Sequence, residues 1–136
     1  MMVTQIAPML AVSDASAAID FYKAAFGAEL LWRLGSEPDI VAGLSIGGAP
    51  FFVAYEAPAY GTRGPASVGF TTVRIELFVD DPVAVHRQAL ASGAVDHSPV
   101  IEQVHDTKGP NPIKRLLQGA IVDSSGHMWL IGKILE

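Results

Sequence analysis

Residues Val12–Ala28 carry the clearest hydrophobic pattern in the chain. Apolar side chains recur three and four positions apart, which is the spacing of one face of an α-helix, and the charged residues fall on the other side. Ser13 or Asp14 can cap the first turn by accepting a hydrogen bond from its free backbone N–H groups. Gly27 suits the left-handed position that ends a helix. The pattern predicts one amphipathic helix that follows directly on a strand.

A second segment of the same kind begins about half a chain length later. The tetrapeptide VDDP at residues 79–82 again ends an apolar strand with a capping residue. Pro82 suits the first helical position, because it has no N–H group to leave unpaired there. Apolar positions with helical spacing follow, and the Gly-Ala pair at 93–94 repeats the pair at 27–28. We interpret the chain as two copies of one structural unit.

Short apolar segments of strand length surround both predicted helices. The Gly47-Gly48 pair tolerates positive φ at both central positions of a tight hairpin and joins two of these segments. Each half therefore has the order β-α-β-β-β, and the excess of strands over helices predicts an α+β fold. The predicted strands are Val3–Val12, Glu29–Leu34, Ile40–Ile46, Phe51–Glu56, Thr71–Val79, Val100–His105, Lys114–Val122 and Met128–Leu135.

Two units with one helix each predict a specific architecture. A single helix covers one face of a four-stranded sheet, so two sheets whose other faces meet, within a chain or between two chains, enclose a cavity. We expect an open, cup-shaped mixed β-barrel in one domain spanning residues 1–136. Unit one covers about 1–57 and unit two about 71–136. Residues 58–70, rich in Gly and Pro, are expected to be a plain linker, with a lid over the cavity as the alternative.

The composition narrows the classes of function. The formal net charge is −5, with nine Lys and Arg in all, which argues against binding to nucleic acid or to an anionic membrane. The chain has no Cys, which excludes disulfides and thiolate chemistry and fits a cytoplasmic protein. We expect no targeting or membrane-spanning segment. Half of the residues are apolar, and this high share indicates a ligand pocket or a subunit interface.

Four sequence features, spread over nearly the whole chain, are shared with a known family. They are the segment VSDASAAIDFYKAAFGAE, the IGG hairpin before an apolar strand, the VDDP helix start, and the closing D-x-x-G-H-M-W at residues 123–129. Together they resemble the glyoxalase/bleomycin-resistance group, also called the vicinal oxygen chelate superfamily, and its PhnB-like branch in particular. The resemblance implies the same fold and a homodimer in which two chains complete two equivalent cavities.

The resemblance implies much less about activity. Members of this superfamily include isomerases, ring-cleaving dioxygenases, fosfomycin-modifying transferases, epimerases and proteins that only sequester antibiotics. Metal-dependent members hold a divalent ion with His, Gln or Glu from the strand before each helix and from the last strand of each half. None of the side chains at the matching positions of this chain is a usual ligand of a divalent cation, so we expect no metal there. Those positions hold Ala7, Arg74, Leu130 and either Phe51 or Phe52.

An atypical metal site is the alternative. Glu76 is two residues beyond Arg74 and so shares its face of the strand. The nearby residues that could complete a site around Glu76 are His105, Asp106, Glu56 and His127, and of these we favour His105 and Glu56. A divalent metal held there would make the protein a glyoxalase-like lyase or isomerase, or a dioxygenase, with Glu76 as the best catalytic candidate.

Without a metal or other cofactor, the remaining residues favour a binding protein. Arg74 can bind an anionic or carbonyl group, and Glu76 can accept a hydrogen bond or act as a base, unless the two form a salt bridge with each other. Trp32 and Phe52 can supply an aromatic wall, and the resemblance selects Trp129, because the tryptophan after Gly-His lies near the ligand in PhnB-like relatives. We expect these five residues to bind a small, partly aromatic molecule, as in the sequestering members. A non-catalytic protein that only dimerises is the third alternative.

Overall fold

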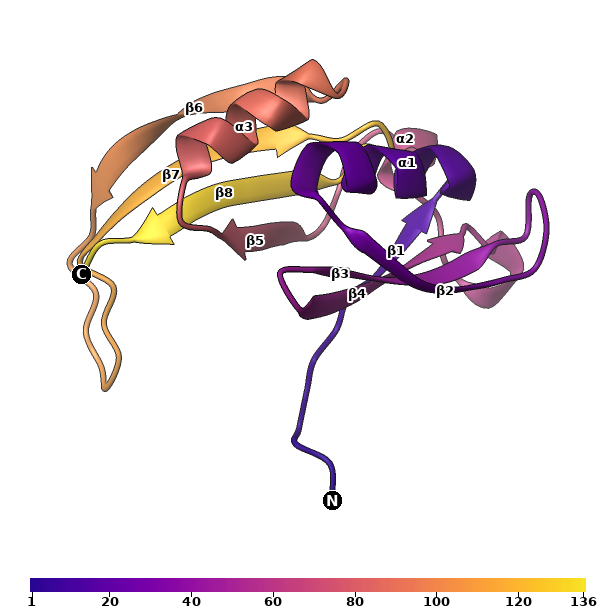
Figure 1. The fold of residues 1–136 in the computed structure, drawn as a ribbon, viewed down its shortest axis with the longest axis horizontal. Helices are drawn as coiled ribbons and strands as arrows, with labels where there is room; N and C mark the ends of the chain where they lie inside the picture. The colour runs from indigo at the N-terminus through magenta and orange to yellow at the C-terminus, as the bar shows by residue number, and fades with distance from the viewer.

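The computed structural model describes residues 1–136 and confirms the repeated β-α-β-β-β order (Figure 1). Unit one contains β1 (Met9–Val12), α1 (Ala15–Phe26), β2 (Glu29–Leu34), β3 (Val41–Ile46) and β4 (Ala49–Tyr55). Unit two contains β5 (Arg74–Phe78), α3 (Pro82–Ala91), β6 (Val95–Val104), β7 (Arg115–Val122) and β8 (Met128–Ile134). Between them, the linker holds a 3₁₀ turn, η1 (Pro58–Tyr60), and a one-turn helix, α2 (Pro65–Val68). None of the helices has the length and apolar character needed to cross a membrane.

Each unit forms its own four-stranded sheet. The strand orders are β1-β4-β3-β2 and β5-β8-β7-β6, so the first strand of each unit lies at an edge of its sheet. That first strand pairs in parallel with the last strand of the unit, and the remaining pairs are antiparallel. The two sheets form a curved arrangement that stays open, as predicted, and α1 and α3 pack against each other on one side of it (Figure 1).

The two long helices begin where the sequence predicts. Asp14 and Asp81 are the N-cap residues, and each carboxylate accepts a hydrogen bond from the backbone N–H three residues later, at 3.0 and 3.1 Å. Of the two N-cap candidates of α1, Ser13 and Asp14, the structure therefore selects Asp14. Gly27 has a φ of 65° and ends α1 as predicted.

The strands differ from the prediction mainly at their ends. β1 begins at Met9 rather than Val3, and the residues before it extend away from the body of the protein (Figure 1). Pro8 marks this departure because it has no N–H group to donate to a neighbouring strand. β6 begins at Val95 rather than Val100 and is therefore longer than predicted. An apolar pattern does not reveal which strand ends pair with a neighbouring strand. The observed strand boundaries differ from the predicted ones for this reason.

The hydrophobic core lies between the helices and the sheets and includes residues of both units. An aromatic cluster at its centre consists of Tyr22 and Phe26 of α1, Phe51 of β4 and Trp129 of β8, with ring centroids 4.8–6.2 Å apart. Because Trp129 belongs to unit two and the other three rings to unit one, the cluster joins the units. The opposite faces of both sheets carry the residues considered next.

Candidate ligand-binding site

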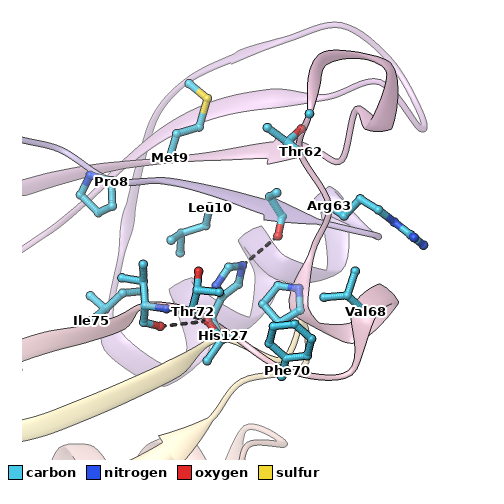
Figure 2. Close-up of a pocket in the computed structure, with 15 residues that line it drawn as sticks. Pro8, Met9, Leu10, Thr62, Arg63, Val68, Phe70, Thr72, Ile75 and His127 are labelled. Atoms are coloured by element: carbon cyan, nitrogen blue, oxygen red, sulfur yellow. Dashed lines mark hydrogen bonds between the residues drawn. The ribbon is translucent and has the colours of Figure 1, made fainter.

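An open cavity of about 380 Å³ lies where the linker crosses between the two units (Figure 2). Its walls come from the edge strand β1, from the linker and the three residues that join it to β5, from the start of β5 and from His127 in the turn before β8. Met9, Phe70 and Val73 expose apolar surface here. A concave site of this size, with mostly apolar walls and a few polar groups, is typical of a small-molecule pocket.

One row of side chains leads from this cavity across the sheet of unit one. Met9 pairs with Phe52, and Phe52 pairs with Gly43, so these positions share one face of the sheet. Trp32 lies over Gly43, where an added Cβ would come within 2.5 Å of the indole ring. The ring centroids of Trp32 and Phe52 are 5.8 Å apart, and Trp32 stays 41% exposed. We call Met9, Phe52 and Trp32 the apolar row; the structure brings the two predicted aromatic residues together.

Arg74 and Glu76 lie on β5, and the ion pairs of the structure include neither of them. Glu76 instead accepts a hydrogen bond through Oε1 from the side-chain amide of Gln118, at 2.9 Å. Gln118 belongs to β7, two strands away, and its neighbour on the intervening β8 is Gly132. Because Gly132 has no side chain, the Gln118 amide can reach across β8 to Glu76. Gln118 is a site residue that the sequence analysis missed.

Trp129 lies on the other side of the sheet from Glu76. Glu76 pairs with Leu130, so the neighbouring Trp129 faces the opposite way, towards Tyr22 of α1. The side chain is 2% exposed, and it does not line the cavity. The expectation that Trp129 contacts a ligand does not match this position. A strand that is apolar on both faces carries no sequence signal for the direction in which its tryptophan points.

A buried carboxylate holds the turn that carries His127. Asp123 is 4% exposed, and its Oδ1 accepts hydrogen bonds from the backbone N–H groups of Ser125 and His127 at 2.9 and 3.0 Å. Its Oδ2 accepts from the indole N–H of Trp129 at 2.9 Å and from the hydroxyl of Tyr22. Burial raises the pKa of Tyr22, and the charge of Asp123 raises it further. The turn before β8 is thus fixed to α1.

The fallback metal ligands do not come together. No three His, Asp or Glu side chains are grouped closely enough to hold a metal ion. Glu56 instead accepts hydrogen bonds from Gly64 N and Ser67 Oγ of the linker, both at 2.8 Å. The bond from Gly64, followed by that from Ser67, lowers the pKa of the Glu56 carboxyl. His105 begins the long loop between β6 and β7, and Glu76 is bonded to Gln118.

The positions that the family resemblance assigns to a metal do not fit one either. A divalent cation needs several anionic or carbonyl oxygens or neutral ring nitrogens that converge on it. The side chains at these positions are the methyl group of Ala7, the aromatic ring of Phe51 or Phe52, the cationic guanidinium of Arg74 and the isobutyl group of Leu130, and none of them is a ligand of this kind.

Comparison with known proteins agrees with the family resemblance described above. The family model for the Glyoxalase/Bleomycin resistance protein/Dioxygenase superfamily matches residues 4–131. An uncharacterized protein of Mycobacterium tuberculosis strain H37Rv is 33% identical over 134 residues, which cover 94% of this chain and 73% of the relative. A corresponding protein of Mycobacterium bovis is also 33% identical, over 94% of this chain and 82% of its own length.

Solved structures share the fold. TioX from Micromonospora sp. ML1 superposes with a TM-score of 0.66 at 24% identity, covering 96% of this chain and 95% of that protein. The fosfomycin resistance protein FosX from Mesorhizobium loti gives a TM-score of 0.60 at 12% identity, over 98% of this chain and 93% of the other. At these identities the likeness concerns the arrangement of the two units and does not extend to side-chain chemistry.

Proposed function

We propose that this chain, which belongs to the Glyoxalase/Bleomycin resistance protein/Dioxygenase superfamily, binds a small, partly aromatic organic molecule. One observation carries the proposal. The cavity of about 380 Å³ reaches Met9, and from Met9 the apolar row continues through Phe52 to the exposed ring of Trp32. A flat apolar molecule bound here would remove aromatic surface from water and stack on Trp32.

The polar residues of β5 and β7 support a role in orienting the ligand. Gln118 holds one carboxylate oxygen of Glu76 and leaves Oε2 without a partner in the protein. Arg74 shares that face of β5 and makes no ion pair, so its guanidinium is available to an anionic or carbonyl group of the ligand. We therefore assign ligand contacts to Trp32, Phe52, Arg74 and Glu76, with Gln118 as the residue that positions Glu76.

Binding of the antibiotic-sequestering type, without a metal, agrees best with these side chains. Neither the positions used by metal-dependent relatives nor the set Glu76, His105 and Glu56 supplies converging ligands. A lyase, isomerase or dioxygenase that acts through a metal is the competing function and is tested below. Within the superfamily we place the chain in the PhnB-like branch, on its D-x-x-G-H-M-W segment, and in the cytoplasm, on its lack of Cys.

We further propose that the protein is a homodimer. All six residues of β2 are exposed, and this strand forms the outer edge of the unit-one sheet. Leu31, Trp32 and Leu34 place large apolar side chains there. An apolar edge strand with unpaired backbone groups is a site at which another chain can bind. A second copy of this chain would cover β2 and would also enclose the ligand on the apolar row. A partner of this kind is expected to make ligand binding and dimerisation mutually dependent.

A thermal-unfolding screen of small aromatic compounds tests the proposed function. In the wild type we expect some compounds to raise Tm by a few degrees, equally with and without EDTA. Trp32→Ala should lose this response, whereas Tyr60→Ala, which removes an exposed aromatic ring of the linker, should keep it. A Tm shift of several degrees on adding Mn²⁺, Fe²⁺, Ni²⁺ or Zn²⁺ alone would favour the metal-dependent enzyme. A full ligand response in Trp32→Ala would exclude the apolar row as the binding site.

A further inference from the structure

His127 lies beside the cavity, and one nitrogen of its ring is hydrogen-bonded to a backbone carbonyl oxygen (Figure 2). Its Nε2 is 2.8 Å from the carbonyl oxygen of Ala11 in β1. A carbonyl oxygen can only accept a hydrogen bond, so Nε2 carries the proton, and Nδ1 of the neutral ring is an acceptor with an open lone pair. Nδ1 has no hydrogen-bond partner in the protein.

This free nitrogen remains accessible although His127 as a whole is only 9% exposed. The buried side-chain atoms that lack a partner do not include Nδ1, so the atom retains contact with solvent. His127 lines the cavity, which therefore offers the route by which a bound molecule can reach it. A hydrogen-bond acceptor in a largely apolar pocket is a strong determinant of specificity. A ligand without a donor leaves this acceptor unpaired, and its binding free energy is therefore less favourable.

The ring is held in this orientation from both ends. The backbone N–H of His127 donates to Oδ1 of Asp123 at 3.0 Å, and the buried Asp123 is fixed in turn by Trp129 and Tyr22. The far edge of the ring is tied to Ala11 of the other unit. The acceptor is thus preorganised before any ligand arrives, which lowers the entropy lost on binding.

We propose that Nδ1 of His127 selects ligands with a hydroxyl or N–H donor attached to a flat apolar body, such as a phenol, an enol or an aromatic N–H group. Leu10, Phe70 and Ile75 supply the apolar walls for that body. The cavity of about 380 Å³ is more than twice the size of a cavity of about 150 Å³ that binds benzene, so it has room for two fused rings. This inference rests on the proposed function, since it names the ligand class that the cavity takes.

Two matched probes test the inference by calorimetry. 2-Naphthol carries a donor, and 2-methoxynaphthalene has the same rings but no donor. We expect the wild type to bind 2-naphthol about five- to tenfold more tightly, which is the effect of one hydrogen bond. His127→Phe keeps a flat ring of similar size and has no acceptor in place of Nδ1, so this preference should fall to about one. Equal binding of the two probes by the wild type would overturn the inference, and so would an unchanged preference in His127→Phe.

Nitrogen NMR of the histidine rings gives a second readout, taken on the wild-type protein. The His127 signals are assigned by their loss in His127→Phe, and we expect the neutral ring to carry its proton on Nε2. The Nδ1 resonance should move with 2-naphthol and stay in place with 2-methoxynaphthalene. Protonation at Nδ1 in the neutral ring would contradict the inference.

The probes also separate this inference from the proposed function. If both compounds bind equally and the thermal screen finds ligands whose effect is lost in Trp32→Ala, the binding function stands and the role of His127 is wrong. If neither compound binds the wild type, the role of His127 is wrong, and the proposed function is then decided by the thermal screen alone.

Discussion

Asp123 is a single carboxylate that accepts four hydrogen bonds while almost fully buried. Two of the donors are backbone groups of its own turn, and the other two are the side chains of Tyr22 in unit one and Trp129 in β8. A buried charge is tolerated when its hydrogen bonds are complete, and removing it leaves several donors unpaired in the core. At the scale of the residue, this carboxylate is a main determinant of how the two units are joined.

We predict that Asp123→Ala lowers the free energy of unfolding by about 3 kcal/mol or more, because the Tyr22 and Trp129 donors lose their acceptor. Urea unfolding measures this loss. The matched control is Asp39→Ala, which removes an exposed carboxylate and should change the stability by less than about 0.5 kcal/mol. A loss below about 1 kcal/mol for Asp123→Ala would mean that the donors find other partners.

Gly43 has no side chain, and this allows the Trp32 ring of the apolar row to lie against the sheet. A Cβ at this position would come within 2.5 Å of the Trp32 indole, so Gly43→Ala should push that ring off the sheet while the backbone keeps its course. We expect acrylamide quenching of the exposed tryptophan to increase, and the ligand-induced rise in Tm to shrink. Trp129 is buried and supplies an internal control, because its quenching should stay low in both proteins. Unchanged quenching would show that Trp32 does not rest on Gly43 in solution.

Gln118 shows what a closer inspection of the sequence can find. It stands two positions from Leu116 and two from Ala120, so beyond Lys114 at its first position this face of the predicted strand is apolar except for a single amide. An isolated polar residue on such a face is a signal for a buried or functional hydrogen bond. The identity of its partner, Glu76 on a strand two places away in the sheet, is not available from that signal.

At the scale of the element, the linker is an ordered wall of the cavity. The Glu56 carboxylate accepts hydrogen bonds from Gly64 and Ser67 at the start of α2, and the residues that follow α2 line the cavity. The alternation of Gly and Pro in this segment predicted a connection without regular structure. A short helix forms because Pro65 occupies its first position and Gly69 its end.

The lowered pKa of Glu56 makes the order of the linker depend on pH. The folded protein favours the ionised form of Glu56. The contribution of this carboxylate to stability is therefore fully present above the ordinary pKa of Glu, and it is lost as the pH falls through the lowered pKa. We predict that Glu56→Gln speeds amide hydrogen exchange in residues 61–70 at neutral pH. This difference from the wild type should vanish on acidification, once the wild-type carboxyl is protonated.

Glu29→Gln is the control for this experiment, because Glu29 is an exposed residue of β2 without a side-chain hydrogen bond. It should exchange like the wild type in the linker at every pH. Equal exchange in Glu56→Gln and the wild type at neutral pH would show that the carboxylate does not hold the linker.

At the scale of the whole molecule, the apolar edge of β2 has no covering partner within the chain. We predict that the wild type sediments as a dimer and that Leu34→Lys shifts it towards the monomer, because a charge at an edge strand opposes pairing with another chain. Analytical ultracentrifugation measures the shift. Tyr60→Lys, which places the same charge on an exposed position of the linker, should remain dimeric. A monomeric wild type would remove β2 from consideration as an interface.

The sequence by itself determined the local elements and their repetition. The helix caps Asp14 and Asp81, the glycine end of α1 and the hairpin at Gly47-Gly48 each depend on a few adjacent residues, so periodicity and turn chemistry predict them. The order β-α-β-β-β, found twice, then restricts the fold to two sheets, each covered by one helix. The family follows from the same local features.

The tertiary structure alone decided the geometry of the site. Trp129 turned into the core because α1 offers it Tyr22 and the buried Asp123, and Gln118 reached Glu76 because Gly132 left a gap between them. The cavity beside His127 exists only where the linker passes between two edge strands. These contacts join segments far apart in the chain, and their formation depends on how the two units pack, which no local pattern of residues specifies.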